Sequence, residues 1–199
     1  MDSDSLRNIV NKWVEPNDEE WLAFSSKLKV RHLSKDEIYH KEGNISKHVA
    51  LVIKGAVRMY YNIEGEERSK DFQFEGQFTG SLASLLTQTP SKFSVAALES
   101  TTLIEISGED LSNLYDTYKV WERFGRIYMT LSFLYKEKRE ASLLFDSSTT
   151  RYENLMREQP EHIQRIPLKH LASYLGIKPE TLSRIRGESL KKLKPKMSS

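Results

Sequence analysis

The feature that most constrains this chain of 199 residues is the stretch from Trp121 to Phe145, which has no proline and only one glycine. Apolar residues recur along it at spacings of three and four, which indicates an amphipathic helix about 30 Å long. A helix of that length with one apolar seam usually packs against a partner. We expect this dimer helix to join two copies of the chain through Phe124, Ile127, Tyr128, Leu131, Leu134 and Tyr135. The alternative is that the seam packs only against the chain's own β-rich part.

The residues before this helix have the pattern of an antiparallel β domain. Strand-like runs such as VALVIKGAVRMYYNI, FSVAALES and TTLIEIS follow one another at roughly ten-residue spacing between about Lys27 and Ser107. Short strands at that spacing are typical of a sandwich or barrel. Residues 1–26 have helical spacing, and Ser107 with Asp110 has the pattern of a helix N-cap. We therefore expect an α+β protein whose first domain, residues 1–145, holds the β-rich part and the long helix.

The residues after the long helix have the pattern of a second, helical domain, residues 146–199. It starts with DSSTT, a polar segment rich in helix-capping residues that is typical of a hinge. Further along, HLASYLGIKPETLSRIR predicts two short amphipathic helices that nearly touch. Gly176 allows a sharp turn between them, and Pro179 suits the first turn of the second helix. The apolar residues expected to pack inside this pair are Leu171, Ala172, Leu175, Ile177, Leu182 and Ile185.

The second helix of the pair has a polar face with no core to bury it. The residues expected to contact DNA are Lys169, Lys178, Glu180, Thr181, Ser183, Arg184 and Arg186. Arginine can pair with guanine, glutamate can accept from cytosine, and a helix-turn-helix lays such a helix in the major groove. Four lysines further on, at positions 191, 192, 194 and 196, could neutralise phosphates. The alternative is an ordinary solvated helix face.

The charge distribution along the chain also favours DNA as a partner. The chain has a net charge of +2, but residues 146–199 hold 11 Lys and Arg against 6 Asp and Glu. A basic segment attached to an acidic body suggests a polyanion such as double-stranded DNA. A solvated basic tail would have the same composition.

Composition and motifs argue against several other classes of protein. There is no cysteine, which excludes disulfides, thiol nucleophiles and cysteine-ligated clusters and suits a reducing cytoplasm. The start of the chain lacks the pattern of a secretory signal, and no apolar run is long enough to span a membrane. The five histidines have no metal-ligand spacing, and no nucleophile, phosphate-loop or metalloprotease motif is present. We therefore expect a cytoplasmic protein that is not an enzyme and has no metal, cofactor or membrane partner.

Taken together, these segments resemble the Crp/Fnr family of bacterial transcription regulators. The similarity rests on HLASYLGIKPETLSRIR, VIKGAVRMYY and LIEIS, and it covers about residues 20–190. It implies a cyclic-nucleotide-binding-type jelly roll, a dimer helix, a hinge and a helix-turn-helix that reads operator DNA. Glu180 and Arg184 match the family's DNA-reading residues, whereas Pro179 replaces an arginine. No strand pattern follows Arg186, so the wing hairpin of the family is expected to be missing or reduced.

The residues at the positions of the family's effector pocket differ from those that cyclic-nucleotide binders have there. The turn FTGSLASL supplies Phe78, Gly80, Ser81 and Leu82, with Ser81 where cyclic-nucleotide binders have a ribose-binding glutamate. Ser91 and Lys92 stand at the positions of the arginine and hydroxyl residue that hold the cyclic phosphate. Lys92 lacks the bidentate fork of arginine, and a polar site without its partners loses affinity. We therefore expect an effector other than cyclic AMP, or a pocket filled by its own side chains.

The sequence thus predicts a homodimeric, DNA-binding transcription regulator on a pseudo-palindromic operator, with an unknown small-molecule effector. RNA polymerase is a candidate partner. The alternatives are a small-molecule or cyclic-nucleotide sensor whose DNA binding is vestigial, and a regulator that acts without an effector.

Overall fold

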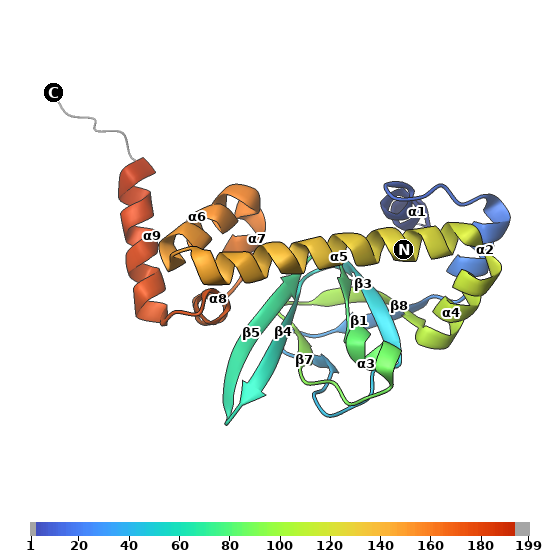
Figure 1. Cartoon of the computed structure of the whole chain (residues 1–199), viewed down its shortest axis with the longest axis horizontal. Coiled ribbons are helices and arrows are strands. Elements are labelled where there is room, and N and C mark those ends of the chain that lie inside the picture. Colours follow the sequence, from blue (N-terminus) through green and yellow to red (C-terminus); the bar gives the residue numbers. More distant parts are fainter. Residues whose placement is uncertain (1–2, 194–199) are drawn as a thin grey trace.

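The computed structural model describes residues 3–193 as a β roll crossed by one long helix, with smaller helices at both ends. Figure 1 shows the long helix α5 (Lys119–Phe145) running along the molecule with the roll on one side of it. The first two helices lie beside its start, and the last four lie around its end. No helix among the described residues is long and apolar enough to cross a membrane.

The roll consists of two four-stranded antiparallel sheets, with strand orders β1-β8-β3-β6 and β2-β7-β4-β5. Its strands are β1 (Lys29–Leu33), β2 (Ile38–His40), β3 (His48–Lys54), β4 (Val57–Ile63), β5 (Glu66–Gln73), β6 (Phe78–Thr79), β7 (Ser94–Ala97) and β8 (Thr101–Ser107). Val52, Val57 and Leu103 are fully buried between the sheets. The expected α+β class with an antiparallel roll is therefore confirmed. The turn FTGSLASL also contains a short helix that the sequence did not predict, α3 (Leu82–Thr87).

The N-terminal helices hold the start of α5 against the roll. They are α1 (Ser3–Asn11) and α2 (Asp18–Ser25), and α2 starts with a capping box between Asn17 and Glu20. Phe24 of α2 stacks on Trp121 of α5, with 4.4 Å between ring centroids. The indole Nε1 of Trp121 also donates to the Glu20 carbonyl at 3.2 Å. This aromatic cluster fixes one end of the long helix.

The helix α4 (Gly108–Thr117) connects the roll to α5. Ser107 is its N-cap, and the Ser107 side chain accepts from the Asp110 backbone N–H at 3.0 Å, as the sequence predicted. The cap satisfies a backbone donor that the first turn of a helix leaves free. This is the point where the β pattern ends and the helical pattern begins.

The C-terminal part is entirely helical within the described residues. Its helices are α6 (Ser148–Glu158), α7 (Pro160–Arg165), α8 (Leu168–Leu175) and α9 (Pro179–Leu193). Pro160 begins α7, because proline fits the first helical position. Residues 108–193 contain no strand, so no wing hairpin lies in this range, and residues 194–199 of the lysine-rich tail lie outside the described residues.

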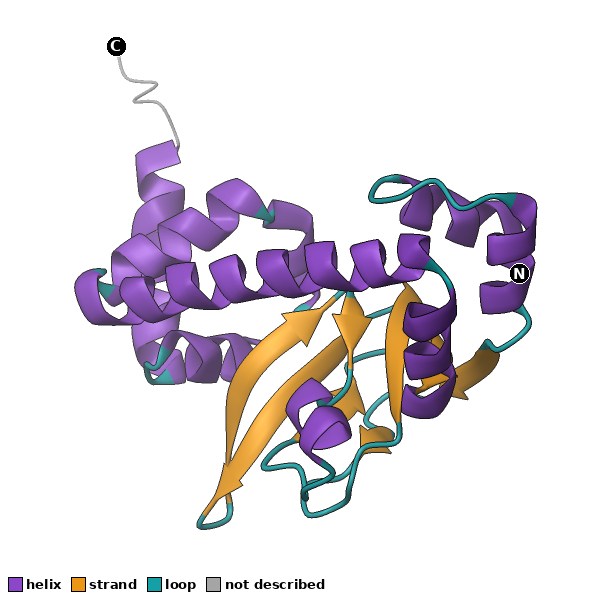
Figure 2. Ribbon diagram, turned by 45° about the vertical axis from the view of Figure 1, so that its right-hand side comes forward, coloured by secondary structure: helices purple, strands orange, loops and turns teal. Residues whose placement is uncertain are grey.

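The C-terminal helices pack directly on the roll, as Figure 2 shows for the sheet edge beside them. One apolar cluster joins Phe72 of β5 and Phe74, the residue after β5, to Tyr174 and Leu171 of α8. Ring centroids of Phe72 and Tyr174 are 5.4 Å apart. The helix α5 ends at Phe145 with Asp146 as its C-cap, and the roll and the C-terminal helices share one apolar cluster. The domain boundary at residue 146 stays a prediction.

Candidate DNA-binding face and ligand cavity

The helices α8 and α9 form the helix-turn-helix that the sequence predicted. Gly176 ends α8 in the left-handed conformation, with φ of 69°, and Pro179 begins α9. The inward-facing apolar residues are all buried: Leu171, Ala172, Leu175, Leu182 and Ile185. Ile177 packs partly buried against the same cluster. The apolar side of α9 is therefore buried by contacts within the chain.

The opposite side of α9 faces away from the protein. Glu180, Ser183 and Arg184 are exposed, and Thr181 and Arg186 are half-buried. Lys169 and Lys178, near the start of α9, are also exposed. Among the described residues, none of these side chains takes part in a recorded hydrogen bond or ion pair. Glu180, Ser183 and Arg184 thus form an exposed polar side of α9 without a hydrogen-bond or ion-pair partner in the part of the chain that the structure describes.

The other helix of the pair, α8, is attached to the roll by polar contacts. The Ser69 backbone N–H of β5 donates to the Ser173 hydroxyl at 2.9 Å. The Tyr135 hydroxyl donates to Asp71 Oδ1 at 3.0 Å and lies 3.2 Å from the Tyr174 hydroxyl. Burial raises the pKa of Asp71, so its charged form is disfavoured there. These contacts connect β5, α5 and α8 in one chain of hydrogen bonds.

A second attachment is centred on Arg58 of β4. Its guanidinium is buried, pairs with Glu67 of β5 and contacts His170 Nδ1 of α8. Burial, together with the charge of Arg58, lowers the pKa of His170 to about 4. The histidine is therefore neutral at neutral pH, and its ring nitrogen can accept from the arginine.

The long helix α5 divides its apolar residues between the roll and solvent. Phe124 is buried, and Tyr128 meets Phe78 edge-on at 4.9 Å, so these two residues pack on the chain's own roll. Tyr135 also contacts the roll, through Asp71. This corrects the expectation that the whole seam faces a second copy. Ile127 is half-buried, whereas Leu131 and Leu134 remain 43% and 55% exposed.

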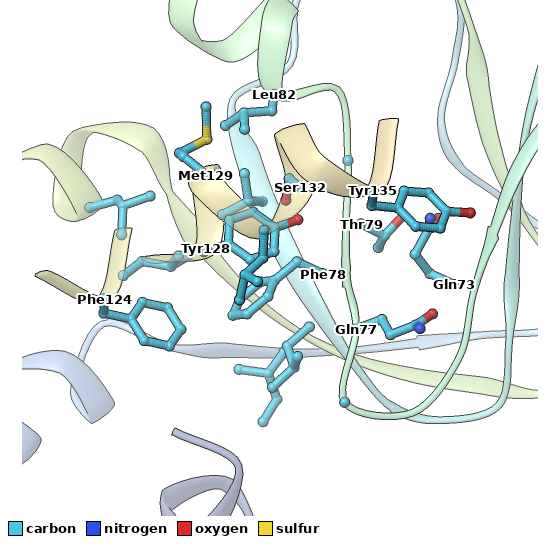
Figure 3. Close-up of a pocket in the computed structure, with 18 of the residues that line it drawn as sticks. Gln73, Gln77, Phe78, Thr79, Leu82, Phe124, Tyr128, Met129, Ser132 and Tyr135 are labelled. Atoms are coloured by element: carbon cyan, nitrogen blue, oxygen red, sulfur yellow. The ribbon is translucent and has the colours of Figure 1, made fainter. Parts of the chain in front are cut away.

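A cavity of about 460 Å³ lies between α5 and the roll. Figure 3 shows Tyr128 over Phe78, with Gln73, Thr79 and Tyr135 grouped beside them. Phe93, Phe124 and Trp121 also line the cavity, and together with aliphatic side chains they make its wall largely apolar. Its volume falls in the usual range for small organic ligands, about 300–1,000 Å³.

Only half of the expected effector residues line this cavity. Phe78, Gly80 and Leu82 do, whereas Ser81, Ser91 and Lys92 do not. The Ser91 hydroxyl donates to the Phe93 carbonyl at 2.8 Å, and Lys92 is exposed. The two positions that would hold a cyclic phosphate therefore present no charge to the cavity.

The polar residues of the cavity that the sequence did not predict include Lys70, Asp71 and Gln73 of β5. They lie in the segment RSKDFQF, which was assigned only as a strand. The alternation of Phe72 and Phe74 could have shown that Asp71 and Gln73 face the opposite side. The same alternation would place Lys70 on the side of Phe72 and Phe74, so it could not have shown that Lys70 lines the cavity.

Comparisons with known proteins agree with this architecture. Residues 30–118 match the family model described as the cyclic nucleotide-binding domain. The structure of FixK2 from Bradyrhizobium japonicum superposes with a TM-score of 0.74 at 18% identity, covering 83% of this chain and 85% of that one. No curated protein gave a significant match.

Two further solved structures share the fold at similarly low identity. The regulator CLP from Xanthomonas campestris, described as responsive to c-di-GMP, has a TM-score of 0.68 at 18% identity, covering 88% of this chain and 93% of that one. A protein from Eubacterium rectale, described as a transcriptional regulator of the Crp/Fnr family, has a TM-score of 0.70 at 19% identity, covering 89% and 86%. Residues 30–118 are thus a cyclic nucleotide-binding-type domain, and the chain has the fold of the Crp/Fnr transcription regulators.

Proposed function

We propose that this protein is a transcription regulator that binds double-stranded DNA as a homodimer. The observation that carries the proposal is the bare polar face of α9, with Glu180, Ser183 and Arg184 exposed while Leu182 and Ile185 are buried. A helix held by its apolar side and free on its polar side suits insertion into the major groove. Arg184 would read a base, and Lys169 and Lys178 would contact phosphates.

The exposed part of the α5 seam supports the dimer. Leu131, Leu134 and Phe145 follow a coiled-coil spacing and are 43%, 55% and 85% exposed. Apolar side chains gathered on one exposed helix face usually mark an interaction site. Two copies joined along α5 would present two α9 helices to a pseudo-palindromic operator, with half-sites about 34 Å apart.

The cavity supports control by a small molecule other than cyclic AMP. It is large enough for an effector, but the residues at the family's phosphate-binding positions, Ser91 and Lys92, do not line it. Because residues of α5 line the cavity and α5 continues to the C-terminal helices, an occupant could bias how the two parts pack. The cytoplasmic location stays a prediction, as does contact with RNA polymerase.

The proposal can be tested without knowing the operator. The full-length protein is used to select duplexes from a random-sequence library, and the selected site is then titrated by fluorescence anisotropy at several salt concentrations. We expect a two-fold symmetric motif and affinity that falls steeply with salt. Arg184→Ala should weaken binding to the selected site by about 1–3 kcal/mol and relax one base preference.

Arg157→Ala is the matched control, since Arg157 is an exposed arginine of the same helical part, on α6. It should leave the preferred sequence unchanged. Failure to select any motif, or an Arg184→Ala protein with an unaltered preference, would contradict the proposal. Ligand binding without DNA binding would instead favour the sensor with vestigial DNA binding.

A further inference from the structure

The cavity contains a cation whose position depends on an irregularity in β5. Met59 pairs with Asp71 and Tyr60 pairs with Ser69, so Lys70 is an extra residue in the ladder. Phe72 and Phe74 pack on the C-terminal helices, and regular alternation would place Lys70 on that side too. The bulge redirects its side chain, and Lys70 lines the cavity next to Asp71.

Lys70 is half-buried, and the neighbouring Asp71 acts on its ammonium group electrostatically without forming an ion pair with it. Lys70 Nζ lies 4.2 Å from the ring centroid of Phe93 and forms no ion pair with a described residue. Its neighbour Asp71 accepts instead from Tyr135 and from the Phe72 backbone N–H. Burial and the nearby charge of Lys136 lower the pKa of Lys70. A buried cation is costly unless an anion pairs with it.

The rest of the cavity suits an aromatic molecule with few polar groups. Phe78 meets Phe124 and Tyr128 edge-on, with ring centroids 5.8 and 4.9 Å apart. Two polar atoms lining the cavity, Thr79 Oγ1 and Gln73 Oε1, are buried without a hydrogen-bond partner. Thr79 is only 3% exposed. Buried polar atoms are normally paired, so these two atoms are candidates to meet a ligand.

We propose that the cavity binds a small aromatic monoanion, whose anionic group pairs with Lys70 and whose ring packs among Phe78, Phe93 and Tyr128. The inference rests on the proposed function, because it names the chemical class of the effector. Pairing with the anion would offset the cost of burying the ammonium. The ring would take up the aromatic contacts, and Thr79 with Gln73 would select a hydroxyl or amino substituent.

Two fluorescent probes that share a ring system distinguish the contribution of the anionic group to binding from that of the rings. Anilinonaphthalene sulfonate is an aromatic monoanion, and N-phenylnaphthylamine has the same rings without the sulfonate. Both are titrated into the full-length protein, its Lys70→Met variant and its Lys35→Met variant. Lys35 is an exposed lysine of the same roll and serves as the control. Thermal melts verify that each variant is folded.

We expect the sulfonate to bind the unaltered protein at least about tenfold more tightly than it binds the Lys70→Met variant, because the charge-assisted contact is lost. The Lys35→Met variant should match the unaltered protein. The uncharged probe should bind the unaltered protein and both variants with similar affinity. Equal affinity of the sulfonate for the unaltered and Lys70→Met proteins would overturn the proposal, as would absence of binding by either probe.

The duplex selected above separates this inference from the proposed function. If the sulfonate binds the unaltered and Lys70→Met proteins equally well while the protein still prefers its selected duplex, only the proposed ligand class is wrong. If the sulfonate depends on Lys70 but no duplex is preferred, the cavity retains its ligand class and the DNA-binding proposal falls.

Discussion

Replacing Leu134 by alanine should weaken the dimer that we propose along α5. Leu134 leaves 55% of its surface exposed in the single chain. Burying a whole leucine side chain is worth about 1.5–3 kcal/mol, so covering roughly half of one contributes about 1 kcal/mol. The two-fold axis places the change in both copies, which gives about 2 kcal/mol per dimer. Since 1.4 kcal/mol corresponds to tenfold, the dissociation constant should rise about 30-fold.

Sedimentation equilibrium over a wide concentration range measures this constant directly. Leu86→Ala is the matched control, because Leu86 is 66% exposed but lies at the end of α3, away from the α5 seam. It should leave the dissociation constant unchanged. The reasoning is refuted if Leu134→Ala dimerises as tightly as the unaltered protein, or if the unaltered protein stays monomeric at every concentration.

Two further predictions concern the roll and its contact with α8. Gly55→Ala should lower the melting temperature markedly, because φ is +90° there and an added Cβ would lie 2.6 Å from the Ser100 carbonyl; an unchanged melting curve would refute this. Acidification should weaken packing of α8 on the roll. His170 has a pKa of about 4 in the folded protein and about 6.5 in the unfolded chain. Its contribution to the free energy of unfolding is therefore complete above pH 6.5 and disappears as the pH falls toward 4. The half-exposed site is screened, so we expect about 1 kcal/mol, and melting curves of His170→Gln should depend less on pH across this window than those of the unaltered protein.

Local patterns in the sequence were sufficient to predict the helices that carry the candidate DNA-binding face. The apolar spacing of Leu171, Leu175 and Leu182 reports which sides of α8 and α9 meet, because the helical period alone fixes which residues share a face. Gly176 and Pro179 mark the turn because their backbone preferences are local. Because the apolar residues of α9 face α8, the remaining side of α9, with Arg184, is predicted to be exposed.

For the long helix α5, local patterns did not predict which surface each apolar residue meets. Periodicity placed Phe124 and Leu134 on one seam, but Phe124 is buried against the roll and Leu134 is half-exposed. One helix face is wide enough to meet two different surfaces, and the sequence does not say where one surface ends. That division depends on how the roll lies under α5.

The sequence by itself determined the order of the parts: a β roll, a long helix, and a helix-turn-helix with a basic setting and a bare polar face. These follow from period, turn residues and charge, which act over a few residues. The tertiary structure alone decided which residues line the cavity: a bulge in β5 turns Lys70 toward it, whereas Ser91 and Lys92 lie outside it. The direction of a side chain at a bulge depends on how the partner strand pairs, and residues far apart in the chain set that pairing.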